Sequence, residues 1–183
     1  MLDYAPDRTK LPSTIDIGHG VIQAEYLNRA NNVAAAINRR IDPHARGEPT
    51  CYAYKVLLPP NAPDALDDHH ALCARFEAQM IPAQVDLMSV TTFRHPHEVP
   101  HHLAWRRTLA FIGEKCVDHF HVAGIAIQHV PGLASRDSKP HIHFLAFARI
   151  LRGSTFGSFS PLVKPGAKAL VGKEWAAWLK VHP

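Results

Sequence analysis

One short segment, residues 140–147 with the sequence Pro-His-Ile-His-Phe-Leu-Ala-Phe, constrains the fold of this 183-residue chain most strongly. It is typical of a β-strand that belongs to a sheet. Side chains alternate between the two faces of a strand, so His141 and His143 lie on the same face. Two imidazoles spaced in this way can bind one metal ion.

A third histidine is predicted to join this pair. The residues 121–130 form another predicted strand, which has His129 near its end. If the two strands pair across the loop at 131–140, His129 comes close to His141 and His143. Three neutral nitrogen ligands would leave open positions on a metal ion, which catalysis requires.

Other interpretations of this spacing stay open. The chain has 14 histidines, so a His-x-His pair can arise by chance. The same pair is also compatible with a cupin-like metal site or with a two-histidine phosphoesterase. The spacing alone does not separate these possibilities.

The remaining pattern predicts an α+β fold with a largely antiparallel central sheet and helices packed on it. The whole chain, 1–183, is expected to form a single domain, with residues 1–17 irregular. Apolar residues recur at helical spacing in several segments, and β-branched runs mark the strands. The predicted helices are 21–39, 64–79, 101–118 and 172–180, and the predicted strands are 51–58, 85–93, 121–130 and 141–151.

Composition excludes several classes of protein. Hydrophobic residues make up 46% and charged residues 20%, which is typical of a globular chain. No apolar run is long enough to span a membrane, and the first residues lack the apolar core of a secretory signal. The three cysteines, Cys51, Cys73 and Cys116, are odd in number and far apart. They favour a reducing, cytoplasmic location and argue against a disulfide framework.

Positive charge gathers in the last third of the chain. The net charge is +4, and residues 131–183 contain 8 Lys and Arg but only 2 Asp and Glu. A basic segment of this kind suits contact with phosphates or another anionic partner. It is equally compatible with a solvated face that keeps the protein soluble.

Two segments around the histidines resemble a known motif. Residues 124–129 (Gly-Ile-Ala-Ile-Gln-His) and residues 139–145 (Lys-Pro-His-Ile-His-Phe-Leu) resemble the third motif of MobA/MobL-type plasmid mobilisation relaxases. These relaxases belong to the HUH endonucleases. The resemblance implies that His129, His141 and His143 bind one divalent metal ion, with Mg²⁺ or Mn²⁺ expected.

Further likenesses extend over nearly the whole chain. Residues 18–29 are similar to the first motif of the family, which implies that a helix carries Tyr26 as the nucleophile. Without the resemblance, Tyr26 is also compatible with a core position on an apolar helical stripe. The segment 173–178 is similar to the family's Glu-x-Trp-Ala helix. Three departures are the polar segment 1–17, the absence of acidic residues in 90–93 and the long loop before His141.

The resemblance implies a reaction on single-stranded DNA at a plasmid origin of transfer. Tyr26 would attack a backbone phosphate and form a 5′-phosphotyrosyl link, and accessory mobilisation proteins would be partners. Arg136, Lys139, Arg149 and Arg152 flank the metal strand and are predicted to hold DNA phosphates. Two alternatives stay open: a non-catalytic DNA-binding relative of this fold, and a metal-dependent phosphoesterase that uses the same histidine cluster.

Overall fold

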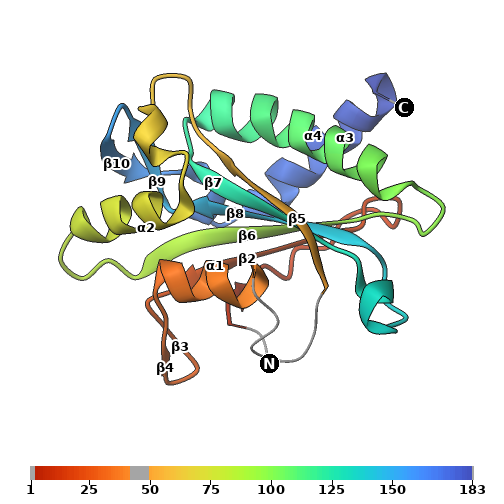
Figure 1. The fold of residues 1–183 in the computed structure, drawn as a ribbon, viewed down its shortest axis with the longest axis horizontal. Coiled ribbons are helices and arrows are strands. Elements are labelled where there is room, and N and C mark those ends of the chain that lie inside the picture. The colour runs from red at the N-terminus through yellow and green to blue at the C-terminus, as the bar shows by residue number, and fades with distance from the viewer. Residues whose placement is uncertain (1–2, 42–49, 183) are drawn as a thin grey trace.

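A six-stranded antiparallel sheet forms the centre of the computed structural model, which describes residues 3–41 and 50–182. Its strand order is β1-β2-β6-β8-β7-β5 (Figure 1). Every neighbouring pair in this sheet is antiparallel, which confirms the predicted α+β class. The six strands are β1 (Ala5–Pro6), β2 (Ile17–Gln23), β5 (Cys51–Leu57), β6 (Asp86–Arg94), β7 (Gly124–His129) and β8 (His141–Phe147).

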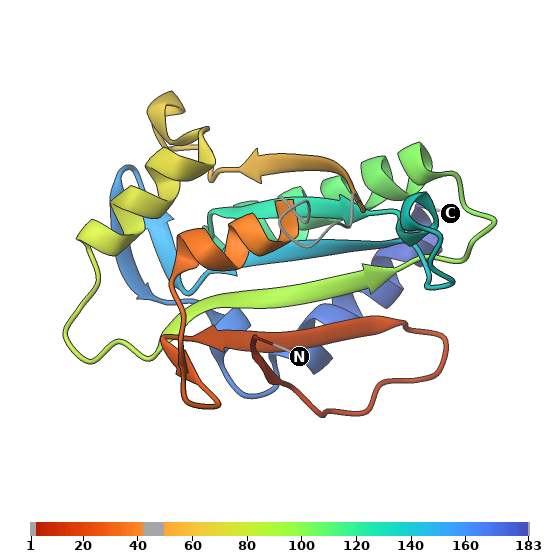
Figure 2. The same cartoon turned by 60° about the horizontal axis from the view of Figure 1, so that its bottom comes forward.

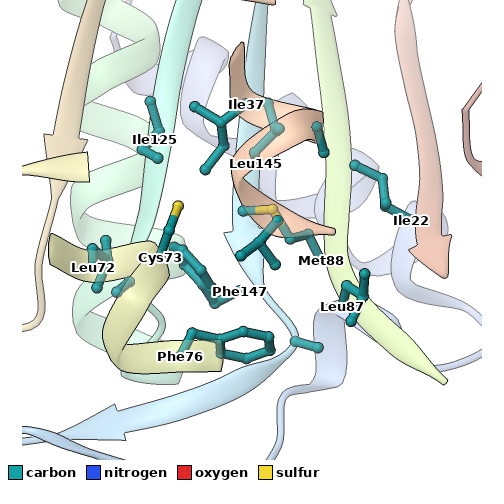
Figure 3. Packing of buried hydrophobic residues seen from close by; sticks show 14 of the residues in the cluster. Ile22, Ile37, Leu72, Cys73, Phe76, Leu87, Met88, Ile125, Leu145 and Phe147 are labelled. Atoms are coloured by element: carbon teal, nitrogen blue, oxygen red, sulfur yellow. The ribbon is translucent and has the colours of Figure 1, made fainter. Parts of the chain in front are cut away.

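Helices cover both faces of this sheet (Figures 1 and 2). On one face, α1 (Val33–Ile41) and α2 (His69–Ala78) pack over a core that contains Phe76, Leu145 and Phe147 (Figure 3). On the other face, α3 (His101–Ile112) and α4 (Ala167–Val181) enclose a second core with Phe111 and Trp175. Among the described residues, no helix has the length and apolar character to cross a membrane.

The predicted helix over residues 21–39 is wrong in its first half. Residues 17–23 instead form β2, which pairs with β6 along its length. A small hairpin follows, made of β3 (Glu25–Tyr26) and β4 (Arg29–Ala30), and α1 begins only at Val33. Leu27 and Asn28 have φ values of 51° and 58°, and positive values at both central positions are what a two-residue hairpin loop of type I′ requires. Sheet pairing therefore overrides the helical spacing of the apolar residues.

The other predicted helices and strands are present in the structure, but their ends differ from the prediction. The strands at 51–58 and 85–93 are confirmed as β5 and β6, and α3 continues as the π-helix η3 (Gly113–Asp118). The first predicted turn of the second helix is a separate 3-10 turn, η2 (Asp64–Leu66). Helix α2 begins after Asp68, whose side chain accepts a 2.8 Å hydrogen bond from the Ala71 amide. Helix α4 begins earlier than predicted, at Ala167.

A second hairpin, at 149–159, lies in a region predicted to be partly loop. Strand β9 (Arg149–Arg152) pairs with β10 (Thr155–Phe159), and Gly153 adopts a positive φ of 58° at the turn. The hairpin places Phe156 in the core against Phe76, at 5.0 Å between ring centroids. The tail after β8 is thus part of the packed domain.

Gly124, the first residue of β7, is predicted to be intolerant of any side chain. A Cβ there would lie 2.5 Å from the Leu145 carbonyl oxygen and 2.6 Å from the Phe144 ring. Gly124→Ala is expected to reduce the free energy of unfolding by about 1–3 kcal/mol, because β8 must move to make room. Urea denaturation followed by circular dichroism measures the change.

Gly113 offers the matched control, because a Cβ at that helical position meets nothing within 4 Å. Gly113→Ala is expected to leave stability unchanged or to raise it by up to about 1 kcal/mol. Equal destabilisation by both substitutions would contradict the close approach of β7 and β8 at Gly124.

A buried histidine makes the fold sensitive to acid. The ring Nε2 of His95 lies 3.0 Å from the Thr108 hydroxyl oxygen, and burial, helped by the charge of Arg107, lowers the pKa of His95 to about 4. An unfolded histidine has a pKa near 6.5, so protonation favours the unfolded chain as the pH falls from about 6.5 to about 4. Above that pH range His95 is neutral in both the folded and the unfolded chain, so its titration does not change the free energy of unfolding.

We therefore expect the stability of the protein to fall between about pH 7.5 and pH 5, with His95 contributing about 2 kcal/mol of the loss. In His95→Gln, the difference in unfolding free energy between these two pH values should shrink by that amount. Urea titrations of both proteins at both pH values measure it. An identical pH dependence in the variant would show that His95 is not the group responsible.

Candidate functional site

Three histidines meet where β7 ends and β8 begins. The register of the sheet places His129 directly opposite His141, and Ile127 opposite His143. Residues opposite each other in an antiparallel pair share a face, so all three imidazoles lie on the face that α1 and α2 cover. The strand β6 ends beside them, with Thr92 opposite His143 and Arg94 opposite His141. Figure 2 shows these strand ends at the right of the sheet.

The distances between the rings suit one shared ligand. Ring centroids are 5.3 Å apart for His129 and His141, 5.2 Å for His129 and His143, and 4.8 Å for His141 and His143. With metal–nitrogen bonds of about 2.1 Å and bond angles of roughly 90–109°, imidazoles on one ion have centroids roughly 4.6–5.3 Å apart. The structure therefore brings the three predicted ligand residues together.

Each ring is held through its Nδ1 atom. Nδ1 of His129 lies 3.0 Å from the Thr50 hydroxyl oxygen, and Nδ1 of His143 lies 2.9 Å from the Thr92 hydroxyl oxygen. Nδ1 of His141 lies 2.9 Å from the Lys139 carbonyl oxygen, which can only accept, so this nitrogen carries the proton. The lone pair of neutral His141 is then on Nε2. Hydrogen bonding at one ring nitrogen that frees the other is usual for metal-binding histidines.

All three rings are neutral at physiological pH. Burial lowers the pKa of His129 to about 4, with a further contribution from His141. Burial also lowers the pKa of His141, and it holds the pKa of His143 well below its ordinary value together with the charge of Arg40. Neutral imidazole is the form that binds metal ions.

Two arginines add positive charge beside the histidines. Arg40, at the end of α1, is buried, and its charge acts on both His129 and His143. Its guanidinium donates to Asp3 at 2.7 and 3.0 Å and to the Ala36 carbonyl at 2.7 Å. Arg94 is partly exposed and pairs with Asp16 at 3.3 Å. Both guanidinium groups are thus paired with carboxylates, which offset part of their positive charge near the rings.

The chemistry of this donor set fits a metal ion. Nε2 of His129 is buried and has no hydrogen-bond partner, which is costly for a polar atom unless a ligand satisfies it. Within residues 3–41 and 50–182, however, no three or more His, Cys, Asp or Glu side chains are already placed as a coordination shell. The rings therefore supply suitable nitrogens but need adjustment to close around an ion.

Tyr26 does not lie with the histidines, contrary to the prediction. It sits half-buried on β3, beyond the end of β2 where Gln23 pairs with Asp86. His143 is opposite Thr92, six residues farther along β6, which is roughly 20 Å at the usual rise per strand residue. Figures 1 and 2 both show the β3–β4 hairpin at the opposite end of the sheet from the loop that joins β7 to β8. The cause is that residues 17–23 form a strand, not a helix.

The four predicted phosphate-binding cations fall into two groups. Arg136 and Lys139 lie in the exposed loop beside the histidines, and Lys139 pairs with Asp16 at 2.9 Å. Arg152 is exposed on the β9–β10 hairpin, beyond the far end of β8.

The prediction that Arg149 holds DNA phosphates is wrong. It is buried, and its guanidinium donates to the carbonyls of Gly157, Gln79 and Phe156. A guanidinium committed to three backbone carbonyls holds the hairpin against the domain and is not free to bind phosphate.

Sequence reasoning missed four residues of this site. Thr50, Thr92, Arg40 and Arg94 contact or face the histidines but match no motif. Arg94 could have been found, because it alternates with Thr92 on β6 and continues the same face. Arg40 and Thr50 lie on other segments of the chain and come close to the histidines only in the folded structure. No local sequence pattern could therefore identify them.

Comparisons with known proteins support the fold. No protein-family profile and no curated protein matches the chain. Among solved structures, a chain described as "Molecular Basis of Vancomycin Resistance Transfer in Staphylococcus aureus" aligns with a TM-score of 0.60 and 17% identity. The alignment covers 72% of this chain and 69% of that chain. The likeness shows a shared architecture.

Proposed function

We propose that this protein is a relaxase-like enzyme that cleaves phosphodiester bonds in single-stranded DNA at a plasmid origin of transfer. A divalent ion, Mg²⁺ or Mn²⁺, would be held by His129, His141 and His143. The observation that carries the proposal is the meeting of three neutral imidazoles with one unpartnered buried nitrogen among them. The shared architecture with a protein of resistance transfer supports the context.

The chain's own residues have separate roles in this proposal. Thr50, Thr92 and the Lys139 carbonyl fix the orientations of the three rings. Arg40 and Arg94 would place positive charge near a bound phosphate, partly offset by their partners Asp3 and Asp16. A bound divalent ion would withdraw charge from a phosphate oxygen, which is what phosphodiester cleavage requires. Arg136 and Lys139, in the adjacent loop, would hold flanking backbone phosphates.

The test is cleavage of labelled single-stranded origin DNA in the presence of Mn²⁺ or Mg²⁺. We expect the wild-type protein to cut, excess chelator to abolish cutting, and His143→Ala to lower the rate by more than about 100-fold, because one ligand is lost. His119→Ala is the matched control, since His119 is exposed just after η3 and precedes the Gly124 end of β7, whereas His129 lies at the other end of that strand. Equal rates in wild type and His143→Ala would refute the metal site.

The position of Tyr26 generates a separate prediction. Because the hairpin that carries it lies at the other end of the sheet, Tyr26→Phe should cut DNA at the wild-type rate, within about twofold. Denaturing gels of reactions with both proteins measure cleavage and any covalent protein–DNA adduct together. Loss of cutting or of an adduct in Tyr26→Phe would show that this phenol reaches the reacting phosphate after all.

A second candidate, a DNA-binding protein that has lost catalysis, is favoured by one observation. The phenol that the relaxase motif assigns as nucleophile lies away from the histidines. On this alternative, the protein binds single-stranded DNA with strong salt dependence, and neither metal ion produces cutting. The same assay, run with a binding measurement, separates the two candidates.

A further inference from the structure

The outer edge of β5 exposes two aromatic rings. In the order of the sheet β5 is the terminal strand, and it pairs with β7 on its inner side. Tyr52 has 56% of its surface exposed and Tyr54 has 48%, although both lie on a strand of the central sheet. Figure 2 shows β5 as the uppermost strand, beside α2 and α3. The pairing of β5 with β7 shifts register between Cys51 and Ala53, where Tyr52 lies. Two large aromatic rings exposed so close together on one edge strand indicate a surface used for binding.

Each tyrosine is supported by a histidine from a neighbouring helix. The Tyr54 ring meets His69, in the first turn of α2, with ring centroids 5.8 Å apart. The Tyr52 ring meets His101, the first residue of α3, at 6.0 Å. Because α2 and α3 cover opposite faces of the sheet, the two contacts hold the tyrosines from both sides of the edge. The rings are thus positioned while still facing solvent.

The same strand leads directly to the histidine site. Cys51, the first residue of β5, lies opposite His129 in the sheet, and the preceding residue, Thr50, contacts His129 Nδ1. A chain lying along β5 past Tyr54 and Tyr52 would therefore arrive beside the three imidazoles. This continuity distinguishes the edge from an isolated aromatic patch.

We propose that the β5 edge, formed by Tyr52 and Tyr54, is a stacking track for the unpaired bases of a single nucleic-acid strand. The proposal deepens the proposed function, because it names how the substrate approaches the histidine site. Every base has a π-face, so stacking on tyrosine recognises single strands without demanding a sequence. Paired bases are already stacked on each other and are not available.

Local charge indicates that stacking carries most of this contact. Lys55 is exposed next to Tyr54, but Asp68 caps α2 beside His69. One cation and one anion together give these neighbours of the tyrosines no net positive charge with which to attract phosphates. The part of the affinity that depends on Tyr52 and Tyr54 should then vary little with salt concentration, unlike phosphate contacts elsewhere.

The test measures binding of a fluorescent single-stranded oligonucleotide of about 16 nucleotides to the whole chain, in chelator so that nothing is cut. Tyr52→Leu and Tyr54→Leu should each weaken binding by about 5- to 100-fold, and Tyr52→Phe and Tyr54→Phe should stay near the wild type. Tyr26→Leu, which changes a tyrosine at the far end of the sheet, is the matched control. Binding to the corresponding duplex should not depend on these tyrosines.

The outcomes separate this proposal from the proposed function. With metal added, the leucine variants should show a raised KM and an unchanged kcat. If wild type never cuts but the leucine variants lose affinity, the enzyme proposal fails and the stacking track stands. If wild type cuts and the leucine variants bind DNA normally, the track is refuted. A changed oligomeric state in sedimentation, with DNA affinity unaltered, would refute it in favour of pairing between copies along β5.

Discussion

The antiparallel register between β7 and β8 is the constraint on which the site depends. It sets His129 opposite His141 and, two residues along, leaves His143 on the same face. If β7 slipped by one residue relative to β8, the histidines of one of the two strands would turn to the opposite face of the sheet, which α3 and α4 cover. The close approach at Gly124, where no Cβ fits, helps to fix this register at the other end of the pair. The packing that stabilises the sheet therefore also positions the three histidines.

Burial and charge act together on the cluster that this register creates. Desolvation keeps the three imidazoles neutral, and Arg40 makes protonation of His129 and His143 still less favourable. The two arginines near the histidines are each paired with a carboxylate, Arg40 with Asp3 and Arg94 with Asp16, which offsets part of their positive charge. A divalent metal ion and a phosphate bound together at the three imidazoles would still strengthen each other's binding, because their charges are opposite.

The sequence predicted secondary structure correctly where a local pattern is compatible with only one type of element. The alternation at 140–147 has period two and predicts β8 together with its histidine face, and the β-branched run at 85–93 predicts β6. The prediction failed in the first half of the predicted helix 21–39, where apolar residues fit helical spacing while Val21 and Ile22 also suit a strand. Pairing with β6 decided the outcome, and the helix begins only at Val33. Arg149 was misassigned because sequence reports a charge but not the carbonyls that surround it.

The pairing of β2 with β6 also fixes the position of Tyr26, and motion of its side chain cannot bring the phenol to the histidines. A tyrosine side chain reaches only about 6–7 Å from its backbone, whereas β6 separates Tyr26 from the histidines by roughly three times that distance. Bringing the phenol to the imidazoles would require β2 to leave β6, which would expose the buried side chains of Ile17 and Ile22 and break a seven-residue ladder. Any nucleophile that serves this site must therefore come from the end of the sheet where β7 and β8 meet, or from solvent.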